Sequence, residues 1–190
     1  AAARVEIDYD PLPAVTDPEA AVRPGAPTLY DEAPDNIALD YHYGDSEQVK
    51  AAFAKATHVT KLRIDNSRVV VNAMEPRAAV GQFENGRFTL HTCSQGVFGM
   101  RGSIAQVLNV DPKQVRVLTG NVGGSFGMKA AVYSEYICVL HAARVLGRPV
   151  KWTDERSTSF VSDSHGRDHQ VTAELALDAA GSFLAVRLTS

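Results

Sequence analysis

The sequence predicts an α+β fold in which helices pack on a mixed β-sheet. Helix-like and strand-like stretches alternate along most of its 190 residues, and two hairpin patterns interrupt the alternation. Hairpins join antiparallel strands, whereas a strand–helix–strand order favours parallel ones, so the sheet is not expected to be purely parallel. The length suits one domain or one and a half, with enough chain to bury a core.

The first 40 residues predict a linker. Residues 5–9 (VEIDY) alternate apolar and polar side chains, which predicts a short strand. Six prolines between positions 11 and 34 then exclude a regular helix or a central strand. We expect residues 1–40 to form an extended linker that leads from a preceding domain. Residues 41–190 are expected to form the first part of a domain that is truncated at its C-terminus, because the chain stops within a strand-like run.

The first helix of that domain is predicted by its cap and its apolar face. Asp45 and Gln48 lie three residues apart, the spacing of a helix N-terminus with a reciprocal cap. Apolar side chains then recur at helical spacing, at Val49, Ala52, Phe53 and Ala56. Residues 59–64 (VTKLRI) predict a strand.

A β-hairpin is predicted next. Strand-like residues 78–83 and 87–92 flank the turn ENG, in which Asn85 and Gly86 tolerate a positive φ. The spacing i, i+4, i+7 and i+8 then predicts a helix with the apolar residues Met100, Ile104, Val107 and Leu108. Residues 115–118 (VRVL) predict a strand that leads into a glycine-rich stretch.

The longest helix is predicted over residues 132–146, and Gly147 and Pro149 end it. Its apolar stripe consists of Val132, Tyr136, Val139, Leu140, Ala143 and Leu146. The remaining strands are predicted at residues 150–153, 169–177 and 183–189, the last two joined in a hairpin across DAAG.

Composition and charge exclude several classes of protein. Hydrophobic residues make up 45% of the chain and charged ones 22%, the net charge is −3, and Lys and Arg are scattered, so we expect no nucleic-acid partner. No apolar run approaches the roughly 18 residues of a membrane span, and no signal-peptide pattern opens the chain. We therefore expect a reduced, cytoplasmic setting.

The two cysteines raise the question of a metal site. His91 with Cys93, and Cys138 with His141, are a possible set of four zinc ligands. However, Cys138 lies between two apolar residues inside a strongly periodic helix, which favours a buried structural cysteine. An iron–sulfur cluster needs about four cysteine ligands, so this chain alone cannot hold one.

The stretch GNVGGSFGMKAA, residues 120–131, is the strongest candidate for a binding loop. It fails as a Walker A loop, because Lys129 is one residue too far from Gly127 and Ala130 lacks the hydroxyl that binds the metal. It also lacks the GxGxxG spacing of dinucleotide-binding proteins. Two interpretations stay open: a tight turn in which glycines permit close packing, and a loop whose backbone N–H groups face an anionic or oxo ligand.

Three other polar features have structural and functional interpretations. Gln95, in TCSQG, is a turn or cap residue, or else an amide that donates to a ligand oxygen. Glu75, in NAMEPR, is expected to pair with Arg77 or another basic group. The run DSHGRDHQ, residues 163–170, is expected to be a polar loop with His165 and His169 at the surface, and the chain has no GxSxG nucleophile motif.

Taken together, three stretches resemble a known family. NAMEPRAAVGQFENGRFTLHTCSQG, QVLNVDPKQVRVLTGNVGGSFGMK and ARVLGRPVKWTDER are similar to the molybdenum-binding large subunit of the xanthine dehydrogenase and aldehyde oxidase family. The opening VEIDYDPLPAVTDPEAA resembles the exit from the small domain that precedes the cofactor domain in that family. Within the family, the tail GMKAAVYSEYICVLHAARVLGRPVKWTDERSTSF most resembles carbon monoxide dehydrogenase large subunits.

The resemblance implies a molybdopterin cytosine dinucleotide cofactor and an oxidoreductase that hydroxylates a small substrate with oxygen from water. The family's glutamine falls on Gln95, and its glycine–phenylalanine loop falls on Ser125, Phe126 and Gly127, close to the molybdenum but not as direct ligands. The cofactor-binding residues that it implies are Gln95, Gly123, Gly124, Ser125, Phe126 and Gly127.

The same resemblance implies partners and marks departures. FAD and iron–sulfur clusters are expected on a flavin-binding medium subunit and an iron–sulfur small subunit, or outside this segment, with homodimerisation of the parent complex. The chain has Ser125 where the family usually has a glycine, and Ala130 where purine-oxidising members carry a glutamate, which argues against xanthine.

The catalytic glutamate of the family, and the copper-binding cysteine of carbon monoxide dehydrogenases, would both follow the last residue. No catalytic residue is therefore expected in this fragment, which should be inactive alone. Carbon monoxide, an aldehyde and an N-heterocycle stay open as substrates. The alternative is a non-catalytic anion- or nucleotide-binding α+β domain, and a weaker one is a family member that serves only as a scaffold.

Overall fold

The computed structural model describes residues 4–190, which form two compact units. One unit comprises residues 4–68 together with residues 167–190, and the other comprises residues 69–166. Each unit combines helices with β-sheet, and the sheet of the second unit is mixed, so the predicted α+β class is confirmed.

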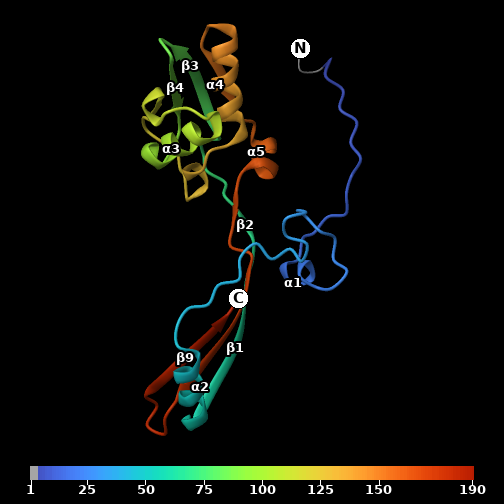
Figure 1. The fold of residues 1–190 in the computed structure, drawn as a ribbon, viewed down its shortest axis with the longest axis vertical. Coiled ribbons are helices and arrows are strands. Elements are labelled where there is room, and N and C mark those ends of the chain that lie inside the picture. Colours follow the sequence, from blue (N-terminus) through green and yellow to red (C-terminus); the bar gives the residue numbers. More distant parts are fainter. Residues whose placement is uncertain (1–3) are drawn as a thin grey trace. The chain divides into compact units, whose positions relative to one another are not determined.

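The first unit is built on a three-stranded antiparallel sheet of order β1-β8-β9 (Figure 1). Its strands are β1 (His58–Asn66), β8 (His169–Leu177) and β9 (Phe183–Thr189). The predicted hairpin at DAAG is confirmed, because the Asp178 side chain accepts hydrogen bonds from the N–H groups of Ala180 and Ser182, and Gly181 has a φ of +83°.

Helix α2 (Ser46–Lys55) packs on strand β9 of the same unit. Its predicted cap is confirmed: Asp45 accepts hydrogen bonds from the N–H groups of Glu47, at 3.1 Å, and Gln48, at 3.0 Å. The predicted apolar face is also confirmed, since the following four residues are half-buried and their helical neighbours exposed: Val49, Ala52, Phe53 and Ala56.

The N-terminal segment differs from the prediction in two details. No strand forms at residues 5–9, because no neighbouring strand pairs with them, and Val5, Ile7 and Tyr9 are exposed. One turn of helix, α1 (Pro18–Ala21), interrupts the irregular segment. Asp17 caps that turn, and proline is tolerated at its first position because the missing N–H would have no partner there.

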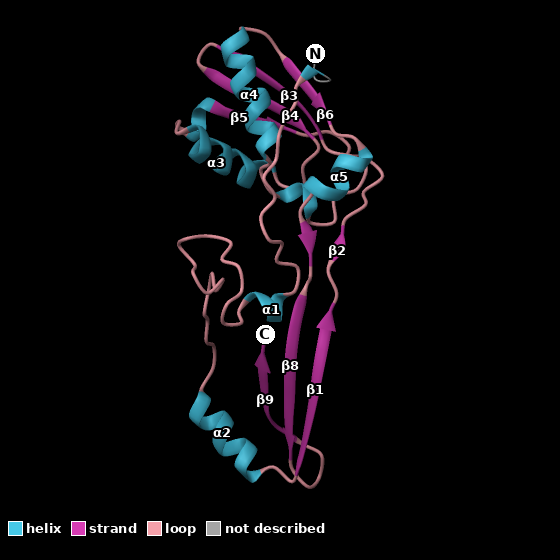
Figure 2. Ribbon diagram, turned by 90° about the vertical axis from the view of Figure 1, so that its right-hand side faces the viewer, coloured by secondary structure: helices cyan, strands magenta, loops and turns pink. Residues whose placement is uncertain are grey.

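The second unit is built on a four-stranded mixed sheet of order β5-β4-β3-β6 (Figure 2). Its strands are β3 (Ala78–Glu84), β4 (Arg87–Thr92), β5 (Val115–Leu118) and β6 (Val150–Thr153). Strands β4 and β5 are parallel, and the other pairs are antiparallel. The predicted turn between β3 and β4 is confirmed, with Asn85 at φ +51° and Gly86 at φ +74°.

Helices α3 (Val97–Leu108) and α4 (Ser134–Leu146) pack on this sheet and enclose the core. The core residues are Ala79, Phe88, Leu90, Met100, Ile104, Ala105, Val115, Val117, Tyr136, Val139 and Leu140. Two members of the predicted apolar stripes lie outside the core, since Val107 and Leu146 are 61% and 55% exposed. Gly147 ends α4 in the left-handed conformation, as predicted.

Shorter elements complete the second unit: β2 (Val69–Val70), η2 (Pro112–Gln114), η3 (Met128–Ala130), α5 (Arg156–Ser162) and β7 (His165–Gly166). The predicted polar loop at residues 163–170 is therefore wrong in part, since it contains β7 and the start of β8. His165 and His169 are exposed, as predicted, whereas Asp163 is buried.

The cysteines differ from the prediction as well. Cys93 is buried, but Cys138 is exposed, because it faces away from the side of α4 that carries Tyr136 and Leu140 into the core. The prediction of a buried Cys138 is wrong. Among residues 4–190, no group of three or more His, Cys, Asp or Glu side chains has an arrangement that could hold a metal ion.

Candidate cofactor-binding site

The glycine-rich loop runs from the end of β5 into η3 in a conformation that demands glycine at specific positions. A Cβ atom on Gly123 would lie 2.5 Å from the Cβ atom of Glu75, and one on Gly124 would lie 3.3 Å from the Cβ atom of Ala73. Gly124 and Gly127 also have φ values of +99° and +90°, which L side chains rarely adopt. These glycines let the loop pack against residues 73–75, so close packing is one reason for them.

Gln95 and the loop meet, although they are about 30 residues apart in the sequence. Gln95 follows β4, and its side-chain oxygen accepts hydrogen bonds from the N–H of Gly127, at 3.0 Å, and from the hydroxyl of Ser125. The backbone N–H of Gln95 donates to the carbonyl oxygen of Lys129 at 3.4 Å. The amide oxygen of Gln95 is therefore occupied by the loop, which leaves its NH₂ group as the end that can donate to a ligand.

Three successive N–H groups of the loop are available as donors. The N–H groups of Gly124, Ser125 and Phe126 have no hydrogen-bond partner within residues 4–190. Consecutive free N–H groups in a turn form an anion-binding concavity. The donor set of this loop therefore fits an oxygen-rich ligand, and tight packing alone does not account for it.

Phe126 is the most unusual residue of the loop. It has a φ of +50°, and it is 79% exposed. A non-glycine residue in the left-handed region costs about 1–2 kcal/mol, and such strain concentrates at functional sites. Its strain and its exposure make Phe126 a candidate ligand contact.

We expect Phe126→Gly to raise the stability of the chain by about 1 kcal/mol, because glycine adopts φ +50° without strain and no core contact is lost. Urea unfolding followed by tryptophan fluorescence measures this change. Phe98→Gly is the control, since Phe98 is also 79% exposed but lies in the helix α3, where glycine should destabilise. A loss of stability in Phe126→Gly would contradict the assignment of strain.

Lys129 does not face solvent. Its side chain is fully buried, and Nζ donates to the carboxylate and to the backbone carbonyl oxygen of Glu75, at 2.8 Å each. The hydrogen bond from Lys129 lowers the pKa of Glu75 below its ordinary value. The predicted pairing of Glu75 with a basic group is confirmed, but the partner is Lys129 and not Arg77. A lysine used in this way is not free to bind a phosphate.

Arg77 is the residue that sequence reasoning missed. Its buried guanidinium lies 2.5 Å from the carboxylate of Asp163, 3.0 Å from Glu135 and 3.6 Å from Asp154. It also stacks on Tyr133, with its Cζ atom 3.7 Å from the ring centroid. The signal in the sequence was a charged residue directly before an apolar strand, in MEPR, but nothing there identified its partners.

Arg77 and Arg156 both hold the segment of residues 73–77, which packs against the loop. The Nη2 atom of Arg156 donates in addition to the carbonyl oxygens of Ala73 and Met74, which are two residues of that segment. Burial lowers the pKa of Arg77, but the hydrogen bonds that Arg77 donates to Glu135 and Asp163 outweigh burial, so its pKa is raised and it stays charged. The segment of residues 73–77 is therefore held rigidly by two arginines.

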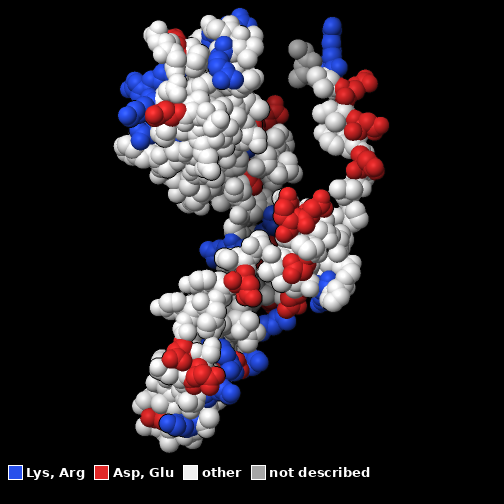
Figure 3. Space-filling model, viewed as in Figure 1, with Lys and Arg blue, Asp and Glu red and all other residues white. Residues whose placement is uncertain are grey.

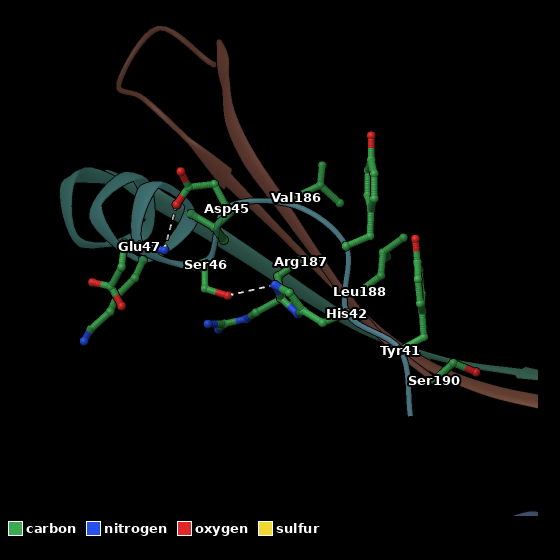
Figure 4. Close-up of a pocket in the computed structure, with 12 residues that line it drawn as sticks. Tyr41, His42, Asp45, Ser46, Glu47, Val186, Arg187, Leu188 and Ser190 are labelled. Atoms are coloured by element: carbon green, nitrogen blue, oxygen red, sulfur yellow. Dashed lines mark hydrogen bonds between the residues drawn. The ribbon is translucent and has the colours of Figure 1, made fainter. Parts of the chain in front are cut away.

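Cavities occur both beside the loop and away from it. One of about 220 Å³ is lined by Glu75, Cys93, Gly120 and Asn121 among others, and lies beside the loop. A larger one of about 810 Å³ lies in the first unit, between the start of α2 and β9 (Figure 4). There the ring of His42 contacts the hydroxyl of Ser46 at 3.0 Å, and no predicted site residue is present.

The third cavity is lined by three arginines that are far apart in the sequence. Arg87, Arg101 and Arg116 line a shallow cavity of about 170 Å³ beside α3 and β5. Figure 3 shows positive side chains over this part of the second unit, and mainly acidic ones along the N-terminal segment. This cavity lies against β5 and α3, and none of the predicted site residues lines it.

Glycines, an amide and N–H groups without a partner among residues 4–190 converge beside a mixed sheet, and this donor set fits an oxygen-rich ligand. Residues 29–190 match the molybdopterin cofactor-binding domain family, and the chain belongs to this family. The predicted family is therefore confirmed. Among residues 4–190, no helix has the length and apolar character needed to cross a membrane.

Two similar proteins agree with this family assignment. The chain is 33% identical to the carbon monoxide dehydrogenase large chain of Afipia carboxidovorans, over 96% of this chain and 24% of that protein. It is 37% identical to subunit gamma of the 6-hydroxypseudooxynicotine dehydrogenase complex of Paenarthrobacter nicotinovorans, over 98% of this chain and 23% of that protein.

A solved structure of the reconstituted CO dehydrogenase from Oligotropha carboxidovorans matches with a TM-score of 0.85 and 33% identity, over 98% of this chain and 25% of that chain. The chain thus spans about a quarter of the length of the relatives that it matches.

Proposed function

We propose that this chain is part of the large subunit of a molybdenum hydroxylase and contributes to the binding of molybdopterin cytosine dinucleotide. Residues 1–40 act as a linker, and residues 41–190 are the first part of the cofactor-binding domain. The observation that carries the proposal is the contact of Gln95 with a loop that has three N–H groups without partners. The residues proposed to face the cofactor are Gln95, Gly123, Gly124, Ser125, Phe126 and Gly127.

When bound, the cofactor supplies a metal centre that accepts two electrons. The residues of this chain bind and orient it. The NH₂ group of Gln95 and the N–H groups of Gly124, Ser125 and Phe126 donate hydrogen bonds to ligand oxygens. The three N–H groups have no partner within residues 4–190, and the side-chain oxygen of Gln95 already accepts hydrogen bonds from the loop. The ring of Phe126 excludes water beside these donors. No residue of this chain is proposed to transfer a proton, and none binds the metal directly.

The proposed reaction is oxidation of a small substrate with oxygen from water, and carbon monoxide, an aldehyde and an N-heterocycle fit it. Purines fit less well, because the exposed Ala130 offers no carboxylate. Electrons would pass to iron–sulfur and flavin groups on partner subunits, since Cys93 and Cys138 cannot hold a cluster. We propose a cytoplasmic complex that contains two copies of the parent subunit.

The rival interpretation is a non-catalytic domain that binds a nucleotide or another anion with the same loop. A phosphate-binding loop would use its lysine to reach the phosphates. Lys129 is fully buried and paired with Glu75, so it is not available for that role. This pairing favours the molybdenum cofactor over a nucleotide.

The test uses the full-length parent protein purified from its native host. We expect molybdenum, and cytidine monophosphate released by acid, in nearly stoichiometric amounts. Gly127→Ala should lower the cofactor affinity roughly tenfold, which corresponds to about 1.4 kcal/mol, because the new methyl group points into the open space of the site.

Gly181→Ala is the matched control. Gly181 also has a positive φ, +83°, and open space around it, but it lies in the hairpin turn of the first unit, so the backbone strain is similar and the site is untouched. A folded parent without molybdenum or pterin would refute the proposal. Equal cofactor loss in both variants would refute the role of the loop.

A further inference from the structure

We propose that Glu75 and Lys129 are positioning residues that fix the loop against Gln95, so that the donors of the site keep one arrangement. This inference rests on the proposed function. It gives a role to the lysine of the glycine-rich stretch, which no phosphate-binding interpretation explains. Glu75 and Lys129 hold the loop of their own chain, and neither residue is expected to touch the metal.

Glu75 holds the beginning of the loop. Its N–H donates to the carbonyl oxygen of Gly123 at 3.0 Å, and its carboxylate accepts a hydrogen bond from the N–H of Gly123 at 2.9 Å. The missing side chain of Gly123 permits this contact, because a Cβ atom there would lie 2.5 Å from the Cβ of Glu75. The backbone and the side chain of Glu75 are therefore both hydrogen-bonded to Gly123.

Lys129 holds the end of the loop to the same glutamate. Its Nζ reaches the carboxylate and the carbonyl oxygen of Glu75, while its own carbonyl oxygen accepts the N–H of Gln95. The loop from Gly123 to Lys129 is thus closed at both ends on Glu75. Gln95 is attached to it twice, through its backbone at Lys129 and through its side chain at Gly127.

The segment that carries Glu75 is itself fixed. Arg156 binds the carbonyl oxygens of Ala73 and Met74, and Arg77 is buried two residues further on. A movement of Glu75 would therefore have to break these contacts. The chain of contacts runs from a rigid segment through the Lys129–Glu75 ion pair to the donors of the loop.

The charges matter more for geometry than for stability. Burying an ion pair costs desolvation energy that offsets much of its attraction, and such pairs are best known for selecting one arrangement. The Glu75 carboxylate is 39% exposed, whereas Lys129 is fully buried, so the lysine depends on this partner. The pair also neutralises the lysine, which leaves the N–H groups as the donors for ligand oxygens.

The experiment compares Glu75→Gln, Lys129→Met and the double variant in the full-length parent. Amide hydrogen exchange of residues 120–129 reports the order of the loop, and the Mo(V) electron paramagnetic resonance spectrum after partial reduction with dithionite reports the metal environment. We expect roughly tenfold faster exchange and an altered spectrum in both single variants, since a charge-assisted hydrogen bond is lost.

The double variant separates positioning from folding. It leaves no unpaired buried charge, so its thermal midpoint should recover most of the loss in Glu75→Gln, in which the buried Lys129 has no counter-charge, while exchange and spectrum stay altered. Glu174→Gln is the matched control, because it removes an ion pair with Arg187 (2.6 Å) in the first unit, and it should change neither readout. Lys129→Arg should restore part of the wild-type exchange protection.

Wild-type exchange rates and an unchanged spectrum in both single variants would overturn the inference. If the double variant regained the wild-type spectrum together with its stability, the pair would be merely structural, and the inference would also fall. If the wild-type parent held no molybdenum, the proposed function would fail. The amide exchange rates of residues 120–129 would still decide whether Glu75 and Lys129 hold the loop in one arrangement.

Discussion

Replacing Arg77 by methionine is expected to lower the free energy of unfolding by about 3–5 kcal/mol, because it leaves buried carboxylates without a counter-charge. The side chains of Asp163 and Asp154 are 0% and 1% exposed, and Arg77 is the cation in contact with both. The unfolding transition in urea can be followed by the fluorescence of Trp152, the single tryptophan of the chain, which lies in the same unit.

Arg148→Met is the control for this substitution. Arg148 is exposed, and no ion pair or hydrogen bond of its side chain is present within residues 4–190, so its removal should change stability by less than about 0.5 kcal/mol. A loss below about 1 kcal/mol in Arg77→Met would contradict the assignment of a buried charge cluster.

The same substitution has an expected dependence on pH. Burial raises the pKa of Glu135, but its hydrogen bond with Arg77 prevails and lowers it. A lowered carboxyl pKa contributes stability above the ordinary pKa, and that stability is lost as the pH falls through the lowered value. Arg77→Met lacks this contribution, so the difference in stability between wild type and variant should shrink below about pH 4.5.

Gly81→Ala is expected to lower the free energy of unfolding by about 3 kcal/mol, because the new methyl group would collide with backbone atoms. Gly81 lies in β3, and a Cβ atom there would be 2.7 Å from the carbonyl oxygen of Val139 and 2.9 Å from the N atom of Leu140 in α4. Backbone atoms cannot move away by a change of rotamer as a flexible side chain can. Helix α4 and strand β3 would therefore have to move apart.

Gly102→Ala is the matched control for Gly81→Ala. Gly102 lies in α3 with no atom near the position of a Cβ and without a positive φ, so alanine should raise stability by about 0.5–1 kcal/mol. Both changes are measured by the urea midpoint. Opposite signs for the two substitutions support the packing of α4 on β3, and a neutral Gly81→Ala would contradict it.

Much of the fold was predictable because its signals are local. The cap of α2 at Asp45, the hairpin turn at Asn85 and Gly86, and the end of α4 at Gly147 each involve residues within a few positions of one another. The errors occurred where burial depends on the rest of the fold. Cys138 has apolar neighbours in sequence but faces outward, and residues 5–9 alternate like a strand but have no partner.

The candidate site was predictable only in part. Family resemblance and the glycine pattern singled out Gln95 and the loop, and the structure brings them together. The partners of the residues that hold them were left open or missed. Glu75 pairs with Lys129, which is 54 residues away, and Arg77 pairs with Asp163, which is 86 residues away. No local pattern identifies partners at such separations.

The sequence by itself determined the helices, the hairpins, the family and the loop, because turn chemistry, apolar periodicity and motif spacing act between near neighbours in the chain. Only the tertiary structure decided which carboxylate meets Lys129, which ones surround Arg77, and that Arg87, Arg101 and Arg116 line one cavity. Those contacts depend on the strand order β5-β4-β3-β6 and on the packing of α4 on this sheet, and strand order is a property of long-range pairing.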